Sequence, residues 1–394
     1  MLRKKIVLIL SVLVFFSFFN GYAYAVDITA ASAVVVDAGT GSVLYEKCPR
    51  EKRSMASTTK IMTALLAIES GRLNDKVRIT DEMVRVEGSS MGLRSGNELT
   101  LGNLIKGMLL LSGNDAANSV AVFLSGSNEK FAVLMNEKAR EIGMRDTHFV
   151  TPSGLDSEEH YTTAYDMALL ASYAMKYPEF SAIVSEYSGK VEFIEPDCTY
   201  TYKNHNRFLN MYDGACGIKT GFTKKSGRCL ITAVKRNGTM LIAVTLKATD
   251  YWEDHRKLYD YVLSTSECRE IEDSFETLVK VTGSDVSEVR CSIKEKPKIT
   301  VFKDSVITTE VLTEKFVYAP VSRGETVGEV RLCVNGKCVK SFPLISEEDA
   351  PVKASDNKSR NIFSRVFDFL IKNCSVSMNV KERHCRYNYV RKYS

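Results

Sequence analysis

A serine and a lysine three residues apart stand at the start of the first apolar helix that the sequence predicts. Ser57 and Lys60 precede residues 61–68, which are apolar on nearly every face and therefore typical of a helix buried in a core. A lysine near apolar surroundings or a second cation loses proton affinity, and such an amine can take the proton of a neighbouring serine. The pair indicates nucleophilic catalysis by Ser57 with Lys60 as its base.

The same spacing also occurs where nothing suggests chemistry. Ser127/Lys130 and Ser355/Lys358 both lie in polar stretches. On its own the spacing is equally compatible with a serine that caps a helix and a lysine whose amine reaches solvent. Partners elsewhere in the chain must decide between the two interpretations.

A second motif, Lys219-Thr220-Gly221, occurs once in the chain and lies in a predicted strand that leads into a turn. The ammonium group of Lys219, placed beside Lys60, would lower the pKa of Lys60 through repulsion between like charges. That ammonium and the Thr220 hydroxyl suit recognition of a carboxylate, and Gly221 leaves room for a substrate backbone along the strand edge. An edge-strand lysine followed by a turn is the structural alternative.

A third motif, Ser112-Gly113-Asn114, joins two apolar segments. The Ser112 hydroxyl could relay a proton to a leaving amine, and the Asn114 amide could hold a peptide group. Ser95-Gly-Asn97 repeats the triplet in a polar run, whereas Ser112 lies between two buried helices that would hold it rigidly. We therefore favour Ser112; a helix-cap turn is the alternative for either serine.

The elements that must position these motifs are strands, then helices, then strands again. A hairpin is predicted over residues 32–46, and further strands follow Gly214 up to a last amphipathic helix over 251–263. Between them, helices are predicted from residue 57 and over residues 101–111, 116–124, 131–142 and 163–175. The order predicts an α/β domain in which an antiparallel sheet is combined with a helical subdomain.

After Cys268 the pattern changes to short strand candidates separated by turn residues, which predicts a small all-β domain. The candidate strands cover residues 279–282, 298–301, 306–311, 316–321, 326–334 and 338–344. The expected division of the chain is a signal peptide over 1–25, an α/β domain over 26–265, a β-rich domain over 268–346, and a linker and tail over 347–394.

Both ends of the chain carry signals that are not part of a folded core. Three cations precede an apolar run over residues 6–19, and Ala23-Tyr-Ala25 suits a signal peptidase, so export is expected; an uncleaved anchor is the alternative. Residues 362–371 have apolar side chains at helical spacing, with basic residues following. They predict a peripheral membrane-surface helix, or equally a docked helix or a disordered tail.

Charge and cysteine usage limit the class of function. Removing the three cations of residues 1–25 lowers the formal net charge from +5 to +2, which gives no reason to expect nucleic-acid binding. The ten cysteines are too dilute for a disulfide scaffold, but Asn335-Gly336 predicts a hairpin turn that places Cys333 opposite Cys338. A disulfide there and free thiols are the two alternatives. No zinc spacing stands out, so neither a metal nor a cofactor is expected.

Together the three motifs resemble those of penicillin-binding proteins and class A β-lactamases, with Ser-Gly-Asn in place of Ser-Asp-Asn. The stretches around them, residues 55–64, 108–118, 147–155 and 217–223, resemble the serine D-alanyl-D-alanine carboxypeptidases, which are low-molecular-weight penicillin-binding proteins. The resemblance covers residues 27–265 strongly, and residues 268–345 are similar to the C-terminal domain of that family with less distinctive residues.

The resemblance implies an activity and a set of roles. The enzyme would remove the terminal D-alanine of peptidoglycan stem peptides through an acyl-enzyme on Ser57, and penicillins would inhibit it. Lys60 would be the base, Ser112 and Asn114 would line the cleft, and Lys219 and Thr220 would hold the terminal carboxylate. The backbone N–H groups of Ser57 and Phe222 would form the oxyanion hole. A carboxylate-binding arginine is expected after the next strand, where Arg256 is one candidate.

Two other functions remain open from the sequence. A β-lactamase needs a carboxylate that activates water, commonly in a Glu-x-x-Leu-Asn loop, and Glu158-Glu159-His160-Tyr161 lacks that pattern. A wall-binding or sporulation scaffold with a vestigial catalytic domain is disfavoured by three intact motifs. The sequence does not decide between hydrolysis and transpeptidation.

Overall fold

The computed structural model describes residues 26–236, 238–354 and 386–393. The signal peptide expected over 1–25 and the apolar tail segment over 362–371 lie outside these residues. The chain divides into two compact units. The first comprises the segment ending at Val36, Tyr45–Arg236 and Leu241–Thr265, and the second comprises Asp37–Leu44, Asn237–Met240 and the residues from Ser266 onward.

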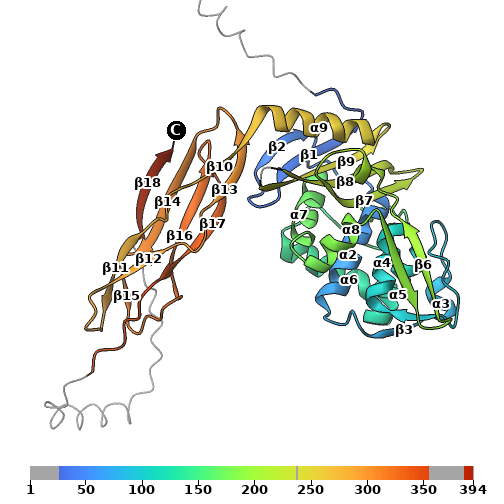
Figure 1. Cartoon of the computed structure of the whole chain (residues 1–394), viewed down its shortest axis with the longest axis horizontal. Helices are drawn as coiled ribbons and strands as arrows, with labels where there is room; N and C mark the ends of the chain where they lie inside the picture. The colour runs from blue at the N-terminus through green and yellow to red at the C-terminus, as the bar shows by residue number, and fades with distance from the viewer. Residues whose placement is uncertain (1–25, 237, 355–385, 394) are drawn as a thin grey trace, which may run out of the picture. The chain divides into compact units, whose positions relative to one another are not determined.

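A five-stranded sheet with strand order β2-β1-β9-β8-β7 forms the centre of the first unit. Its strands are β1 (Ser32–Asp37), β2 (Val43–Lys47), β7 (Ala215–Thr223), β8 (Gly227–Arg236) and β9 (Thr239–Ala248). Helix α9 (Tyr251–Thr265) lies along one face of this sheet, and a group of helices lies on the other (Figure 1). The predicted hairpin, the return of strands after Gly214 and the last helix are confirmed, and β7 is an edge strand.

The helical group is built around α2 (Lys60–Glu69), in which eight of the ten residues are buried. The two helices predicted on either side of Ser112 are confirmed as α4 (Leu101–Leu111) and α5 (Asn114–Ser125). Two further predicted helices are confirmed as α6 (Asn128–Ile142), which ends at Gly143 with φ of 90°, and α7 (Ala164–Ala174). A left-handed C-cap of this kind is the conformation that favours glycine.

Several short elements in this unit were not predicted. They are β3 (Lys76–Arg78), α3 (Asp81–Val84), β4 (Glu98–Thr100), α8 (Pro178–Ser185), β5 (Ser188–Phe193), β6 (Cys198–Lys203) and the 3-10 turn η2 (Arg207–Asn210). The strands among them form two separate two-stranded sheets, β3–β4 and β5–β6, so their sequences need not be apolar on both faces.

The second unit is all-β, as the sequence predicted. A seven-stranded sheet has the order β15-β11-β12-β17-β16-β14-β18, and β10 pairs with β13 separately. The bounds are β10 Ser266–Glu270, β11 Thr277–Thr282, β12 Glu288–Ser292, β13 Lys298–Phe302, β14 Ile307–Glu314, β15 Phe316–Tyr318, β16 Thr326–Val334, β17 Lys337–Ser346 and β18 Arg386–Tyr393. Strands β10, β12 and β18 were not predicted.

Strand β18 corrects the interpretation of the C-terminal tail. Residues 386–393 pair with all eight residues of β14 in an antiparallel register, rather than belonging to a linker or a membrane-surface segment. The segment is rich in tyrosine, which favours strands. Within the described parts of the chain, no helix has the length and apolar character needed to cross a bilayer.

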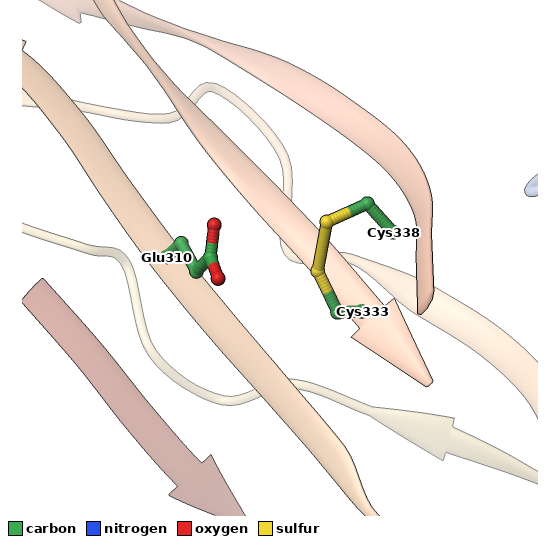
Figure 2. Close-up of side chains that lie close together, drawn as sticks. All are labelled: Glu310, Cys333 and Cys338. Atoms are coloured by element: carbon green, nitrogen blue, oxygen red, sulfur yellow. A yellow bond between two sulfur atoms is a disulfide. The ribbon is translucent and has the colours of Figure 1, made fainter. Parts of the chain in front are cut away.

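The β16–β17 hairpin predicted from the Asn-Gly turn is confirmed, and of the two alternatives for its cysteines the structure has the disulfide. Cys333 and Cys338 are directly opposite each other in the strand register, and their sulfur atoms are bonded (Figure 2). The carboxylate of Glu310 on β14 lies beside them, and the ligand atoms of the three residues are all within 4.8 Å of one another. Because the two sulfurs are bonded to each other, this group presents one carboxylate rather than a set of three metal ligands.

A buried histidine joins α9 to the central sheet. His255 is fully buried, and its ring nitrogens lie 2.7 Å from Thr232 Oγ1 and 2.9 Å from Thr245 Oγ1. Burial lowers the pKa of His255 to about 3. The ring is therefore neutral in the folded protein throughout the range in which an unfolded histidine gains a proton.

Acid is expected to destabilise the fold through this residue. Below the unfolded pKa of about 6.5, the unfolded chain binds a proton that folded His255 excludes, so the free energy of unfolding should fall by about 1.4 kcal/mol per pH unit for this group. Chemical denaturation between pH 7 and pH 4.5 measures the slope. His255→Gln should be less stable at pH 7 but lose stability less steeply; an unchanged slope in that variant would contradict the assignment.

Candidate active site

The segment that carries Ser57 is a tight turn rather than the regular helix predicted from Ser57 onward. A 3-10 turn, η1 (Ala56–Thr59), precedes α2, which begins at Lys60. Ala56 has a φ of 48°, a left-handed conformation that is uncommon for a residue other than glycine. A β-carbon on Gly154 would come 1.9 Å from Ala56 O, so the loop at residues 151–154 lies directly against this turn. The site therefore begins with a locally strained backbone at the residue before the serine.

The amine of Lys60 is surrounded by three oxygen atoms and is fully buried. Its Nζ lies 3.0 Å from Ser57 Oγ, 2.7 Å from Asn114 Oδ1 and 2.7 Å from the Ser153 carbonyl oxygen. Asn114 Nδ2 donates to Glu87 O at 2.7 Å, which fixes the amide so that its oxygen faces Lys60. The two oxygen atoms at 2.7 Å, Asn114 Oδ1 and Ser153 O, can therefore only accept hydrogen bonds from Lys60.

This arrangement has a consequence for the neutral amine. A neutral amine has two hydrogens and one lone pair, and the acceptors at Asn114 and Ser153 use both hydrogens. The lone pair is then left for the hydroxyl of Ser57 at 3.0 Å. In this geometry the neutral amine of Lys60 can act as a general base that accepts the proton of Ser57.

The electrostatic surroundings favour the neutral form of Lys60. Burial is the largest cause that lowers the pKa of Lys60 well below its usual value, the positive charge of Lys219 is the second, and Asp115 opposes them. Lys219 is itself buried, and burial lowers its pKa to about 7. The charge of Lys219 is thus one of the causes that favour the neutral form of Lys60.

The Ser112 loop is held by the start of α5. Ser112 adopts a left-handed conformation with φ of 62° between α4 and α5, and it is buried. The Asp115 carboxylate accepts hydrogen bonds from the Ser90 hydroxyl at 2.6 Å and from backbone N–H groups of residues 91, 92, 93 and 116. Asp115 therefore fixes the neighbouring loop against the motif. The competing Ser95 is exposed, in a turn where Asn97 Oδ1 accepts from Arg94 N.

Strand β7 passes close to the nucleophile turn. A β-carbon on Gly221 would lie 3.1 Å from the backbone nitrogen atoms of Ser57 and Thr58, so this position admits no side chain without movement. Lys219 Nζ donates to Thr220 O at 3.0 Å, and Phe222, the residue after Gly221 in β7, is 63% exposed. The eight residues predicted for the site thus come from η1, α2, the α4–α5 joint and the edge strand β7.

The same segments match a known family of enzymes. A family model described as D-alanyl-D-alanine carboxypeptidase matches residues 20–250 of the chain. The chain belongs to the D-alanyl-D-alanine carboxypeptidase family. A second model, described as the C-terminal domain of penicillin-binding protein 5, matches residues 270–352 of this carboxypeptidase.

Individual relatives agree with this assignment. The carboxypeptidase is 32% identical over 333 residues to D-alanyl-D-alanine carboxypeptidase DacF of Bacillus subtilis, covering 81% of this chain and 85% of that protein. It is 31% identical over 370 residues to D-alanyl-D-alanine carboxypeptidase DacC of Escherichia coli, covering 88% of this chain and 89% of that protein. Penicillin-binding protein 5 of Haemophilus influenzae has a similar structure, with a TM-score of 0.68, 27% identity and coverage of 82% of this chain and 98% of that one.

These similarities establish the class of reaction. The protein is a serine-type D-Ala-D-Ala carboxypeptidase of the penicillin-binding type, and inhibition by penicillin is general for its family. Its fold combines the mixed α/β penicillin-binding fold with a C-terminal all-β domain.

Sequence reasoning missed three contributors to the site of the carboxypeptidase. The Ser153 carbonyl is a backbone atom, which no motif reports, and Asp115 and His160 act through contacts with loops distant in the sequence. The sequence left the carboxylate-binding arginine open, with Arg256 as one candidate. Arg256 is exposed and forms ion pairs with Glu253 at 2.6 Å and Asp260 at 2.9 Å, so its guanidinium is already engaged.

Proposed function

We propose that Ser57 is the residue that attacks the substrate and that Lys60 is its general base. The support is the position of Lys60 Nζ among Asn114 Oδ1, Ser153 O and Ser57 Oγ. When the amine is neutral and donates its two hydrogens to Asn114 and Ser153, its lone pair is left to accept the proton of the Ser57 hydroxyl. Attack forms a bond between Ser57 Oγ and the carbonyl carbon of the penultimate D-alanine, and the hydroxyl proton passes to Lys60 Nζ.

The remaining residues of the cleft take the roles that their positions suit. Ser112 relays a proton to the amine of the leaving D-alanine, so that the peptide C–N bond breaks and an ester on Ser57 remains. The backbone N–H groups of Ser57 and Phe222 stabilise the negative oxygen, a contribution typically worth about 3–4 kcal/mol per donor in such sites. Lys219 and Thr220 hold the terminal carboxylate of the stem peptide at the edge of β7, alongside Gly221.

Water then releases the shortened peptide from the ester. All three hydrogen-bond partners of Lys60 among the described residues are uncharged. The carboxylate that acts on Lys60 through its charge, Asp115, already accepts hydrogen bonds from the Ser90 hydroxyl and from four backbone N–H groups, so it is not free to activate a water molecule. This favours a slowly hydrolysed penicillin adduct over the rapid turnover of a β-lactamase. Lys60 remains the nearest base for the water that attacks the ester.

We also propose that the enzyme works outside the cytoplasmic membrane. The support is the basic and apolar N-terminal sequence of residues 1–25 and a substrate that belongs to the cell wall. Peripheral contact between the C-terminal region and a membrane stays a prediction from the spacing of residues 362–371.

Ser57→Ala is expected to abolish both release of D-alanine and covalent labelling by a fluorescent penicillin, because within the described residues Ser57 Oγ is the one hydroxyl that is hydrogen-bonded to Lys60 Nζ. Labelling is read on a denaturing gel, and D-alanine by an amino-acid oxidase assay. The matched control is Ser95→Ala, which alters the exposed serine of the duplicate triplet and should leave both signals unchanged. Persistent labelling of the Ser57→Ala protein would rule out the proposed nucleophile.

A further inference from the structure

We propose that His160 is a positioning residue for the acylation of Ser57. It ties the nucleophile turn to the loop at residues 150–154, and so keeps the amine of Lys60 aligned with the serine hydroxyl. The inference rests on the roles proposed for Ser57 and Lys60. His160 itself touches neither residue and lies outside the three sequence motifs.

A directional chain of hydrogen bonds runs through the histidine. The backbone N–H of Val150 donates to His160 Nδ1 at 2.9 Å, so Nδ1 must carry a lone pair. The proton of the neutral ring is then on Nε2, which lies 2.8 Å from Thr59 Oγ1 and donates to it. Thr59 in turn donates to the carbonyl of Ala56 at 2.8 Å. One tautomer of His160 therefore connects the loop at Val150 to the residue before Ser57.

The loop that His160 holds also supplies one of the two acceptors that orient Lys60. Its Ser153 carbonyl accepts from Lys60 Nζ at 2.7 Å, and its Pro152 carbonyl accepts from Thr63 Oγ1 at 2.6 Å. Gly154 packs against the Ala56 carbonyl so closely that a side chain there would collide with it. Displacing the loop would therefore move an atom that fixes the direction of the Lys60 lone pair.

The surroundings of His160 keep the ring neutral and in this orientation. The residue is 2% exposed, and the Phe149 ring lies edge-on to it at 5.9 Å between centroids. Burial, and to a smaller extent the charge of His148, lower the pKa of His160 to about 4. At neutral pH the ring of His160 is therefore uncharged, with one nitrogen that donates and one that accepts.

The test compares His160→Ala with His160→Gln in the full-length protein. Glutamine can accept from Val150 N–H and donate to Thr59, whereas alanine can do neither. The rate of acylation by a fluorescent penicillin is measured against pH for both variants. We expect alanine to lower the rate at neutral pH by about 10- to 100-fold, as a small misplacement of catalytic groups does, and glutamine to restore most of it.

The pH dependence distinguishes positioning from a general loss of stability. A loosened loop admits water to Lys60, and because burial is the main cause of its low pKa, that pKa should rise. The half-maximal acylation rate of His160→Ala should therefore move to higher pH. His255→Ala is the matched control, since among the described residues it removes a second deeply buried neutral histidine; it should lower stability without moving the pH profile of acylation.

Specific results of these experiments would overturn the positioning role of His160. Wild-type rates with an unmoved profile in His160→Ala, or a glutamine variant as slow as the alanine variant, would overturn the proposal. If His160→Ala does not fold, Thr59→Val breaks the same chain at its other end and should show the same slowed acylation and shifted profile. Labelling of Ser57→Ala would instead overturn the roles of Ser57 and Lys60, and so separates failure of those roles from failure of this inference.

Discussion

Replacing Lys60 by arginine is expected to lower the rate of acylation by penicillin and of D-alanine release by between about 10²- and 10⁴-fold, the usual contribution of a positioned base. An arginine keeps the positive charge and hydrogen-bond donors but stays protonated at all accessible pH values, so it cannot accept the Ser57 proton. Lys60→Met should be similarly impaired, because it removes the amine altogether. Stopped-flow or gel-based acylation kinetics at pH 7–9 measure the loss.

The control for this prediction is Lys106→Arg. Lys106 lies on α4 and forms an ion pair with Glu186 at 2.8 Å, which an arginine can keep. That variant should acylate at the wild-type rate. If Lys60→Arg kept more than a tenth of the wild-type rate, a different group would have to remove the serine proton, and the assignment of Lys60 as the base would be wrong.

Lys219→Met is expected to make the protein more stable and less active. Lys219 is 1% exposed with a pKa of about 7, against about 10.4 for a lysine in an unfolded chain. Loss of a charge-assisted hydrogen bond to the substrate carboxylate should lower kcat/KM for a D-Ala-D-Ala peptide by about 10- to 100-fold. Holding this lysine in the core costs stability on the order of 4 kcal/mol at pH 7, and methionine removes that cost.

The sign of the pH dependence follows from the same shift. Between pH 7 and pH 10 the unfolded lysine binds a proton that folded Lys219 has lost, so the free energy of unfolding of the wild type should rise with pH. In Lys219→Met the free energy of unfolding, measured from denaturation curves, should rise less between pH 7 and pH 10. The rise that remains would come from Lys60, the other buried lysine of the site. Lys224→Met, at an exposed lysine just after β7, should leave both slope and stability unchanged. A Lys219→Met protein less stable than the wild type at pH 7 would contradict this account.

Much of this fold could be predicted because its elements have strong periodic patterns. Segments such as α4 and α5 are apolar at helical spacing and bury most of their residues, and the strands after Gly214 are apolar runs ended by turn residues. Elements outside the main sheet were missed, including β5 and the exposed β6. They pair locally, so neither face has to be apolar throughout.

The motif residues of the site could be predicted from side-chain chemistry, but the geometry that relates them could not. The positive φ of Ala56 places Ser57 on a 3-10 turn, where the sequence alone indicated an ordinary helix start. The acceptor at Ser153 is a carbonyl that every residue has, and only the path of the loop puts it beside Lys60. His160 acts through contacts 101 residues apart in the sequence, a separation that no local pattern encodes.

The most direct test of the central claim is to treat the intact protein with penicillin, digest it, and locate the adduct by tandem mass spectrometry. We expect a single added penicilloyl group on the peptide that contains Ser57, with fragment ions that place it on that serine. An adduct on Ser112, on Ser95 or on any other residue would contradict the proposal that Lys60 activates Ser57.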